Sequence, residues 1–115
     1  MLNQVVLVGR LTRDPEIKIL ADGKKVGDIT LAVQRGFKNM EGSYDTDFIR
    51  CSLWEGLATS IETYCKKGVM IALKGRLQTW KYEKEEDKSY TVLEVVAERI
   101  TFLSSANKTK EVMEE

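Results

Sequence analysis

Residues 73–84 read LKGRLQTWKYEK, a stretch that alternates like a β-strand. Successive side chains of a strand fall on opposite faces, so Leu73, Gly75 and Leu77 share a face that suits a hydrophobic core running out to an exposed tip. The opposite face holds no aliphatic side chain, and its members are Lys74, Arg76, Gln78, Trp80, Tyr82 and Lys84. Two large aromatic rings among cations therefore need an explanation, either by packing or by binding.

Four other segments are typical of strands, because they are short, apolar and rich in β-branched residues. They are residues 4–11 (QVVLVGRL), 26–35 (VGDITLAVQR), 47–54 (DFIRCSLW) and 90–103 (YTVLEVVAERITFL). Gly9 interrupts the first segment, which predicts a bulge or a sharp bend there. Residues 16–20 (EIKIL) alternate only weakly, so five strands are expected in all.

Between the third and fourth expected strands the period changes to that of a helix. In residues 55–68 (EGLATSIETYCKKG), apolar side chains recur at helical spacing, at Leu57, Ala58, Ile61, Tyr64 and Cys65. Lys66 and Lys67 are expected in the last turn, with Gly68 as the C-terminal cap. The order predicts an all-β chain with one helix, an OB-fold five-stranded barrel with the helix between strands three and four. An α+β roll is the alternative from the pattern alone.

Composition excludes several classes of function. The 115 residues suit one domain, and no apolar run approaches the ~18 residues of a membrane span, so no membrane partner is expected. No export signal is recognised at the N-terminus, so Cys51 and Cys65 are expected to be reduced and buried. The chain has no histidine, no phosphate-binding GxxxxGK loop and no metal-ligand spacing. No catalytic residue, metal site or cofactor is therefore predicted, and the chain is not expected to be an enzyme.

Charge is distributed unevenly, although its total is zero. Residues 1–82 hold 13 basic and 9 acidic side chains, whereas residues 83–115 hold 5 basic and 9 acidic ones. The acidic excess falls in one expected hairpin tip, residues 83–87, and in the C-terminal residues. A neutral total is therefore compatible with a local basic groove on the strands.

The aromatic–basic pattern of residues 73–84 occurs twice more. In residues 47–54, one face is apolar (Ile49, Cys51 and Leu53), and the other holds Phe48, Arg50, Ser52 and Trp54. The second expected strand continues into Arg35, Phe37 and Lys38. A flat ring can stack on an unpaired base of any identity while interleaved cations track phosphates, so the three clusters favour single-stranded nucleic acid as the ligand. For any one ring, packing across strands or at a barrel end is the alternative.

Five motifs resemble, in order and spacing, the bacterial and phage single-stranded-DNA-binding protein family. They are residues 3–18 (NQVVLVGRLTRDPEIK), 29–33 (ITLAV), 48–58 (FIRCSLWEGLA), 64–82 (YCKKGVMIALKGRLQTWKY) and 90–103 (YTVLEVVAERITFL). The resemblance covers residues 1–103. It implies an OB-fold that assembles as a homotetramer and binds and protects single-stranded DNA regardless of sequence, in replication, recombination, repair or DNA uptake.

The resemblance also implies roles for individual residues. Phe37, Phe48, Trp54 and Tyr82 stand at aromatic positions of the family pattern, and Trp80 replaces one of its cations. All five are expected to stack on bases. Cations of the pattern are matched at Arg50, Lys67, Arg76 and Lys81; together with Arg10, Arg35 and Lys38, these are the expected phosphate contacts.

The expected DNA-binding domain spans residues 1–103, and residues 104–115 are expected to form a short disordered tail. The family's long linker and acidic, Phe-ended tip have no counterpart in residues 108–115 (KTKEVMEE). Recruitment of repair or replication proteins through such a tip is therefore not expected. The expected location is the cytoplasm, at the nucleoid. The alternative function is a primosome-type OB module whose aromatic faces contact a protein.

Overall fold

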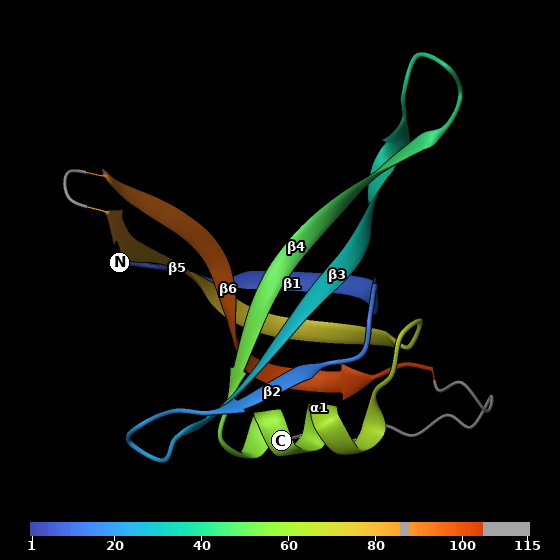
Figure 1. The fold of residues 1–115 in the computed structure, drawn as a ribbon. Helices are drawn as coiled ribbons and strands as arrows, with labels where there is room; N and C mark the ends of the chain where they lie inside the picture. Colours follow the sequence, from blue (N-terminus) through green and yellow to red (C-terminus); the bar gives the residue numbers. More distant parts are fainter. Residues whose placement is uncertain (86–87, 105–115) are drawn as a thin grey trace.

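The computed structural model describes residues 1–85 and 88–104 of the chain. Its elements are β1 (Val5–Leu11), β2 (Glu16–Ile19), β3 (Lys25–Lys38), β4 (Tyr44–Trp54), α1 (Gly56–Tyr64), β5 (Met70–Glu85) and β6 (Lys88–Phe102) (Figure 1). The predicted disordered tail lies outside the described residues except for Ser104, and it stays a prediction.

Five of the strands close into a barrel. β1 pairs antiparallel with both β3 and β5, and antiparallel ladders also join β3 to β4 and β5 to β6. A short parallel ladder, Cys51 to Val95 and Ser52 to Val96, joins β4 to β6 and completes the circuit. Closure pairs most of the edges that an open sheet of this size would present, although β1 meets β3 only at Arg10 and Leu11. The predicted OB-type barrel with one helix is confirmed.

The sixth strand, β2, was not among the expected ones. It pairs with the beginning of β3, Glu16 to Asp28 through Ile19 to Lys25, outside the barrel circuit. Only Ile17 of its four residues is partly buried. Polar and apolar residues alternate over its four positions, but Ile19 is 67% exposed, so this short strand depends on its pairing with the neighbouring β3. The helix therefore follows the fourth strand in chain order, although it follows the third strand of the barrel.

The apolar faces of the strands fill the barrel, and α1 covers one end of it. Leu31, Leu53 and Ile71 of the strands are fully buried and share one cluster with Ile61 of α1. Gly75 lies where β5 crosses β6 most closely, because a Cβ atom there would stand 2.2 Å from the carbonyl oxygen of Val96. The ladder shifts register at this point, between Lys74 and Gly75. Gly75 therefore permits a close approach of β6 at an irregular point of the ladder.

Gly9 has a different role from the predicted one. The β1–β5 ladder runs through it in unbroken register, with Gly9 opposite Ile71. A Cβ atom at Gly9 would lie 2.6 Å from the carbonyl oxygen of Ala32 on β3. The glycine therefore allows β3 to approach β1 where the barrel closes, and no bulge forms in that ladder.

The helix ends earlier than the sequence suggested. Cys65 is extended, with φ −120° and ψ 141°, so Lys66 and Lys67 lie beyond the last turn. Gly68 does adopt a positive φ, 91°, but its amide donates to the carbonyl of Leu11 at 2.8 Å instead of capping the helix. This contact fixes the entry into β5. None of the helices in the described part of the chain is long and apolar enough to cross a membrane.

Two long hairpins diverge from the barrel, β3–β4 on one side and β5–β6 on the other (Figure 1). The β3–β4 hairpin ends in residues 39–43, where the Asn39 side-chain oxygen accepts hydrogen bonds from the amides of Glu41 and Ser43. Both hairpins continue strands whose other ends lie in the barrel. Side chains on one strand can therefore belong either to the barrel or to an arm.

Candidate nucleic-acid interface

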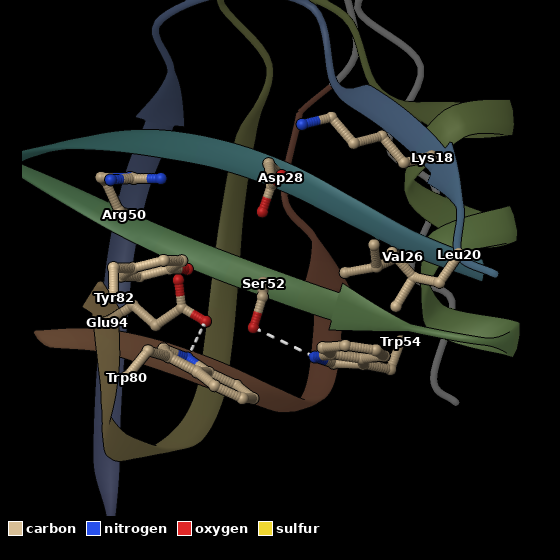
Figure 2. A pocket seen from close by; sticks show the side chains of 10 residues that line it. All are labelled: Lys18, Leu20, Val26, Asp28, Arg50, Ser52, Trp54, Trp80, Tyr82 and Glu94. Carbon is tan, nitrogen blue, oxygen red and sulfur yellow. Dashed lines mark hydrogen bonds between the residues drawn. The ribbon is translucent and has the colours of Figure 1, made fainter. Parts of the chain in front are cut away.

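A cavity of about 260 Å³, here called the indole hollow, opens on the barrel surface. Five strands or their immediate ends contribute to it: β2, β3, β4, β5 and β6. Its lining residues are Lys18, Leu20, Val26, Asp28, Arg50, Ser52, Trp54, Trp80, Tyr82 and Glu94 (Figure 2). Three of the five predicted stacking residues, Trp54, Trp80 and Tyr82, are thus brought together with the cation Arg50.

Alternation along β4 explains why these side chains reach the surface together. Cys51 and Leu53 point into the core and are 1% and 0% exposed. Arg50, Ser52 and Trp54 occupy the intervening positions and line the indole hollow. The predicted division of β4 into an apolar and an aromatic–basic face is therefore confirmed.

The two indoles face one another and are held by buried acceptors. The ring centroids of Trp54 and Trp80 are 6.4 Å apart, with 30° between the ring planes. Trp54 Nε1 donates to Ser52 Oγ at 3.2 Å, and Trp80 Nε1 donates to Glu94 Oε1 at 2.5 Å. Ser52 and Glu94 are only 2% and 8% exposed. Both rings therefore have fixed orientations before any ligand arrives.

A tyrosine pair extends the aromatic surface along the β5–β6 hairpin. Tyr82 and Tyr90 lie directly opposite each other in the ladder, and their rings stack at 5.7 Å with 24° between planes. Both are nearly half exposed, at 45% and 48%. Tyr90 was not among the predicted stacking residues. Pairing residues 73–84 with residues 90–103 as a hairpin would have placed it opposite Tyr82.

The two phenylalanines among the predicted stacking residues do not line the indole hollow. Phe37 stands on the outer part of β3, and Phe48 lines a second, apolar hollow of about 300 Å³ together with Leu77 and Leu93. Phe37 and Phe48 are each 67% exposed. Leu77, which was expected on the core face, is 42% exposed because β5 has already left the barrel at that point. The predicted core face of residues 73–84 therefore ends at Gly75.

Two of the predicted phosphate contacts adjoin the indoles. Arg50 lines the indole hollow, and Arg76 lines a neighbouring cavity of about 280 Å³ together with Trp54 and Trp80. Arg76 Nη1 donates to the side-chain oxygen of Gln78, which directs the guanidinium along β5. Lys81 is exposed further out on the same strand.

The other predicted cations lie elsewhere or are already engaged. Arg35 makes a two-pronged contact with Asp47, with both N–O distances 3.0 Å, and lies 3.7 Å from Asp45. The hydrogen bonding that Arg35 donates to the Asp47 carboxylate raises the pKa of Arg35 and lowers the pKa of Asp47. The Lys38 ammonium lies 5.9 Å from the centre of the Tyr44 ring. Arg35 and Lys38 therefore brace the β3–β4 hairpin in the absence of a ligand.

Arg10 and Lys67 each form a hydrogen bond that involves the loop between α1 and β5. Arg10 Nη1 donates to the carbonyl of Gly68 at 2.9 Å, and the Lys67 amide donates to Asp14 Oδ1 at 2.8 Å. Neither residue lines the indole hollow or the cavity beside Arg76. The sequence pattern does not distinguish them from Arg50 and Arg76, because their separation depends on the barrel geometry.

The described residues contain no group of three or more His, Cys, Asp or Glu side chains that could hold a metal ion. Both cysteines are buried and free. Burial raises the pKa of each thiol to about 12, with the negative charge of Glu94 adding to the effect on Cys51. Neither thiol is therefore a nucleophile at neutral pH.

Comparison with known proteins agrees with this geometry. The model of the "Single-strand binding protein family" matches residues 2–103. The chain is 42% identical to single-stranded DNA-binding protein B of Bacillus subtilis (strain 168) over 110 residues, which are 96% of this chain and 97% of that protein. It is 46% identical to single-stranded DNA-binding protein 1 of Lactococcus lactis subsp. lactis over 110 residues, or 96% of this chain and 73% of that protein.

A third relative is longer. The single-stranded DNA-binding protein of Halalkalibacterium halodurans is 47% identical over 103 residues, which are 90% of this chain and 61% of that protein. The chain thus spans nearly the whole of one relative and about three fifths of another. The family match covers the barrel, both hairpins and every residue of the indole hollow, so this chain belongs to the single-strand binding protein family.

Proposed function

We propose that the chain binds single-stranded DNA and is not an enzyme. The observation that carries the proposal is the pair of indoles, Trp54 and Trp80, oriented by buried acceptors and flanked by Arg50 and Arg76. The relatives named above are each called single-stranded DNA-binding proteins, and their matches include this surface. The DNA-binding domain is residues 1–103, with residues 104–115 as a tail.

Stacking supplies affinity that does not depend on base identity. Every base has a π-face, and stacking on an aromatic ring contributes ~1–3 kcal/mol per base. Trp54, Trp80 and Tyr82 form a continuous surface for successive bases, to which Tyr90 adds on the hairpin. Phe48 and Phe37 are exposed rings that extend the path along the β3–β4 side. Bases in a duplex are already stacked on one another, so this surface selects unpaired strands.

Phosphate contacts supply the remaining affinity. Arg50, Arg76 and Lys81 lie beside the rings, where the backbone of a stacked strand passes. Arg10, Lys67, Arg35 and Lys38 lie outside the indole hollow, so their contacts require a strand long enough to wrap around the barrel. Each phosphate neutralised adds about −0.7 to the slope of log K against log salt for single strands.

Tryptophan emission during titration with oligo-dT tests the proposal. The chain has 2 tryptophans, and both are proposed contacts, so stacking should quench most of the emission. We expect binding that weakens steeply with salt, and much weaker binding of a duplex of equal length. Emission and mobility unaffected by oligo-dT, or equal affinity for the duplex, would contradict the proposed function.

Assembly into a homotetramer is part of the proposal. β1 pairs with β3 only through Arg10 and Leu11, so the edge from Val5 to Val8 has no β3 partner in the described part of the chain. Val6 and Val8 on this strand are 67% and 49% exposed. An uncharged apolar edge of this kind invites pairing with a second copy. Light scattering should give about four times 13.1 kDa; a monomer at micromolar concentration would contradict the assembly.

Cellular role follows from this activity. A protein that coats unpaired DNA prevents reannealing and shields the strand from nucleases, which suits replication, recombination, repair or DNA uptake. The corresponding location is the cytoplasm, at the nucleoid. Loss of single-strand protection in cells that lack the chain is the test of this role.

A further inference from the structure

Glu94 is an unexpected group on a DNA-binding surface. It lies on β6, is 8% exposed, and lines the indole hollow beside Trp80 and Tyr82 (Figure 2). A carboxylate repels phosphate, and no cation among the described residues lies within 4.0 Å of it. Its position therefore needs a role other than charge balance.

The hydrogen bonding of Glu94 is incomplete. Oε1 accepts the indole N–H of Trp80, and the described residues offer no second donor to the carboxylate. A carboxylate has about four acceptor positions on its two oxygens. No described side-chain oxygen or nitrogen is fully buried without a partner, so the other oxygen of Glu94 keeps some exposure, and Glu94 lines both the indole hollow and the apolar hollow beside Phe48. A ligand in the indole hollow can meet this acceptor.

We propose, on the basis of the DNA-binding function above, that Glu94 accepts a hydrogen bond from the amino group of an unpaired base held in the indole hollow. A cavity of about 260 Å³ suits one base better than a larger ligand, and aromatic rings line it. A base that stacks there has its polar edge directed toward the neighbouring polar groups. Glu94, an acceptor only, pairs with donors on that edge.

This chemistry distinguishes the bases. Cytosine carries the N4 amino group, a donor that carboxylates accept from, and adenine and guanine also carry amino groups. Thymine carries no amino group: it presents the carbonyl O4 in that place, and its one donor on this edge, N3–H, lies between two carbonyl oxygens that a carboxylate repels. The hollow therefore adds a graded preference for amino-bearing bases to binding that is otherwise independent of sequence.

The charge of Glu94 also orients the strand. The carboxylate disfavours a phosphate next to Glu94, whereas Arg50, Arg76 and Lys81 draw the phosphates to other parts of the surface. Bases are then directed inward and the backbone outward. Glu94 is thus both the positioning group for Trp80 and the contact for the base edge.

The test compares oligo-dC with oligo-dT of equal length in the wild-type chain and in Glu94→Gln. Glutamine keeps an oxygen for the Trp80 indole but adds an amide N–H₂ that can donate to thymine O4. We expect the ratio of dC to dT affinity to fall about fivefold in the variant, from the loss of one charge-assisted hydrogen bond at one base. Removing a negative charge strengthens the binding of oligo-dC and oligo-dT alike, so the ratio of the two affinities reports only the contact with the base.

Glu98→Gln is the matched control. Glu98 is an exposed glutamate on the same strand and lines none of the three hollows. Its substitution removes the same charge, and we expect the dC to dT ratio to remain that of the wild type. A ratio unchanged within twofold in Glu94→Gln, with oligo-dT binding intact, would overturn the inference and leave the proposed function standing.

A second measurement leaves the protein unaltered. Oligo-dC can be compared with an oligomer in which pyrimidin-2-one, which lacks the amino group, replaces cytosine. We expect about the same fivefold loss of affinity for the wild-type chain, and little loss for Glu94→Gln. Equal wild-type affinity for both oligomers would overturn the inference even if the variant failed to fold. Failure of the wild-type chain to bind either oligomer would instead contradict the proposed function.

Discussion

The barrel surface and the β3–β4 hairpin both carry aromatic rings and arginines, but these side chains differ in how they are hydrogen-bonded and paired. On the barrel, the indoles of Trp54 and Trp80 are hydrogen-bonded to buried acceptors, and Arg50 beside them has no ion-pair partner among the described residues. On the hairpin, Phe37 is 67% exposed, and Arg35 is bound to Asp47. The barrel thus has ordered rings and an available cation, whereas the hairpin has a loosely held ring and an engaged cation.

This difference indicates where binding energy resides. An ordered ring loses little conformational entropy when a base stacks on it, and an unpaired guanidinium needs no partner displaced. An exposed ring on a projecting hairpin must be ordered, and a paired arginine must exchange one anion for another. A ring or an arginine on the barrel should therefore contribute more to the free energy of DNA binding than the same type of residue on the hairpin.

The largest expected difference is between the rings. Trp54→Ala and Trp80→Ala should each weaken oligo-dT binding by ~1–3 kcal/mol, because each removes an oriented stacking surface. Phe37→Ala should weaken oligo-dT binding clearly less than either tryptophan substitution. Titrations followed by electrophoretic mobility avoid the loss of the fluorescent reporter. Equal losses in all three variants would mean that ring orientation is immaterial.

The next difference is electrostatic. Arg50→Ala should reduce the salt slope of binding by about 0.7, the contribution of one phosphate on a single strand, along with the affinity. Arg35→Ala should reduce the slope by less, because Arg35 already neutralises Asp47. Affinities measured at several salt concentrations give both slopes. A larger effect of Arg35 would place the main phosphate path on the hairpin instead of the barrel.

Much of the barrel was predictable from the sequence, since alternation is a local signal. The apolar positions of β4 and β5 indicated the core faces, and the helical period of residues 57–65 indicated the element between them. Ends of elements were less accurate. Gly68 was interpreted as a helix cap because glycine with a positive φ commonly has that role, yet its amide contacts Leu11 on β1. That contact joins distant parts of the chain and has no local signature.

The indole hollow was only partly predictable, for the same reason. Trp54 and Trp80 were expected on binding faces, but Ser52 and Glu94 were not expected to fix them. Trp80 and Glu94 are 14 residues apart and come together only through the register of β5 with β6. The separation of Arg10 and Lys67 from the indole hollow likewise depends on barrel closure. Sequence alone indicated the chemistry of the site, and the register determined which residues share it.

A smaller effect is expected for the tyrosine pair, which lies on an arm but is ordered by stacking. Tyr82→Ala should weaken oligo-dT binding by about threefold to tenfold, less than loss of an indole, because the remaining Tyr90 ring can take over part of the contact. Tyr90→Ala should have a weaker effect of the same sign. The double variant should lose more binding free energy than the sum of the losses in the two single variants. Strict additivity would show that the rings act independently.

The smallest expected effect is a gain in affinity for oligo-dT. Asp47→Asn removes the carboxylate that engages Arg35, so the guanidinium becomes available to phosphate, and oligo-dT affinity at neutral pH should rise by about twofold. The substitution is not expected to disturb the ladder, because Asp47 pairs with Val33 through the backbone. Asp45→Asn is the control, since Asp45 lies 3.7 Å from Arg35 and makes no hydrogen bond to it in the described part of the chain. It should change the affinity less.

The pH dependence of this gain identifies its cause. Arg35 lowers the pKa of Asp47 below its ordinary value of 3.8, so the carboxylate stays charged and paired throughout the neutral and mildly acidic range. The pair stabilises the hairpin above pH 3.8 and is lost as the pH falls through the lowered pKa. The affinity advantage of Asp47→Asn should therefore be constant from pH 8 to about pH 5, where Asp47 remains ionised. An advantage that disappears within this range would mean that another titrating group, and not release of Arg35, produces the gain.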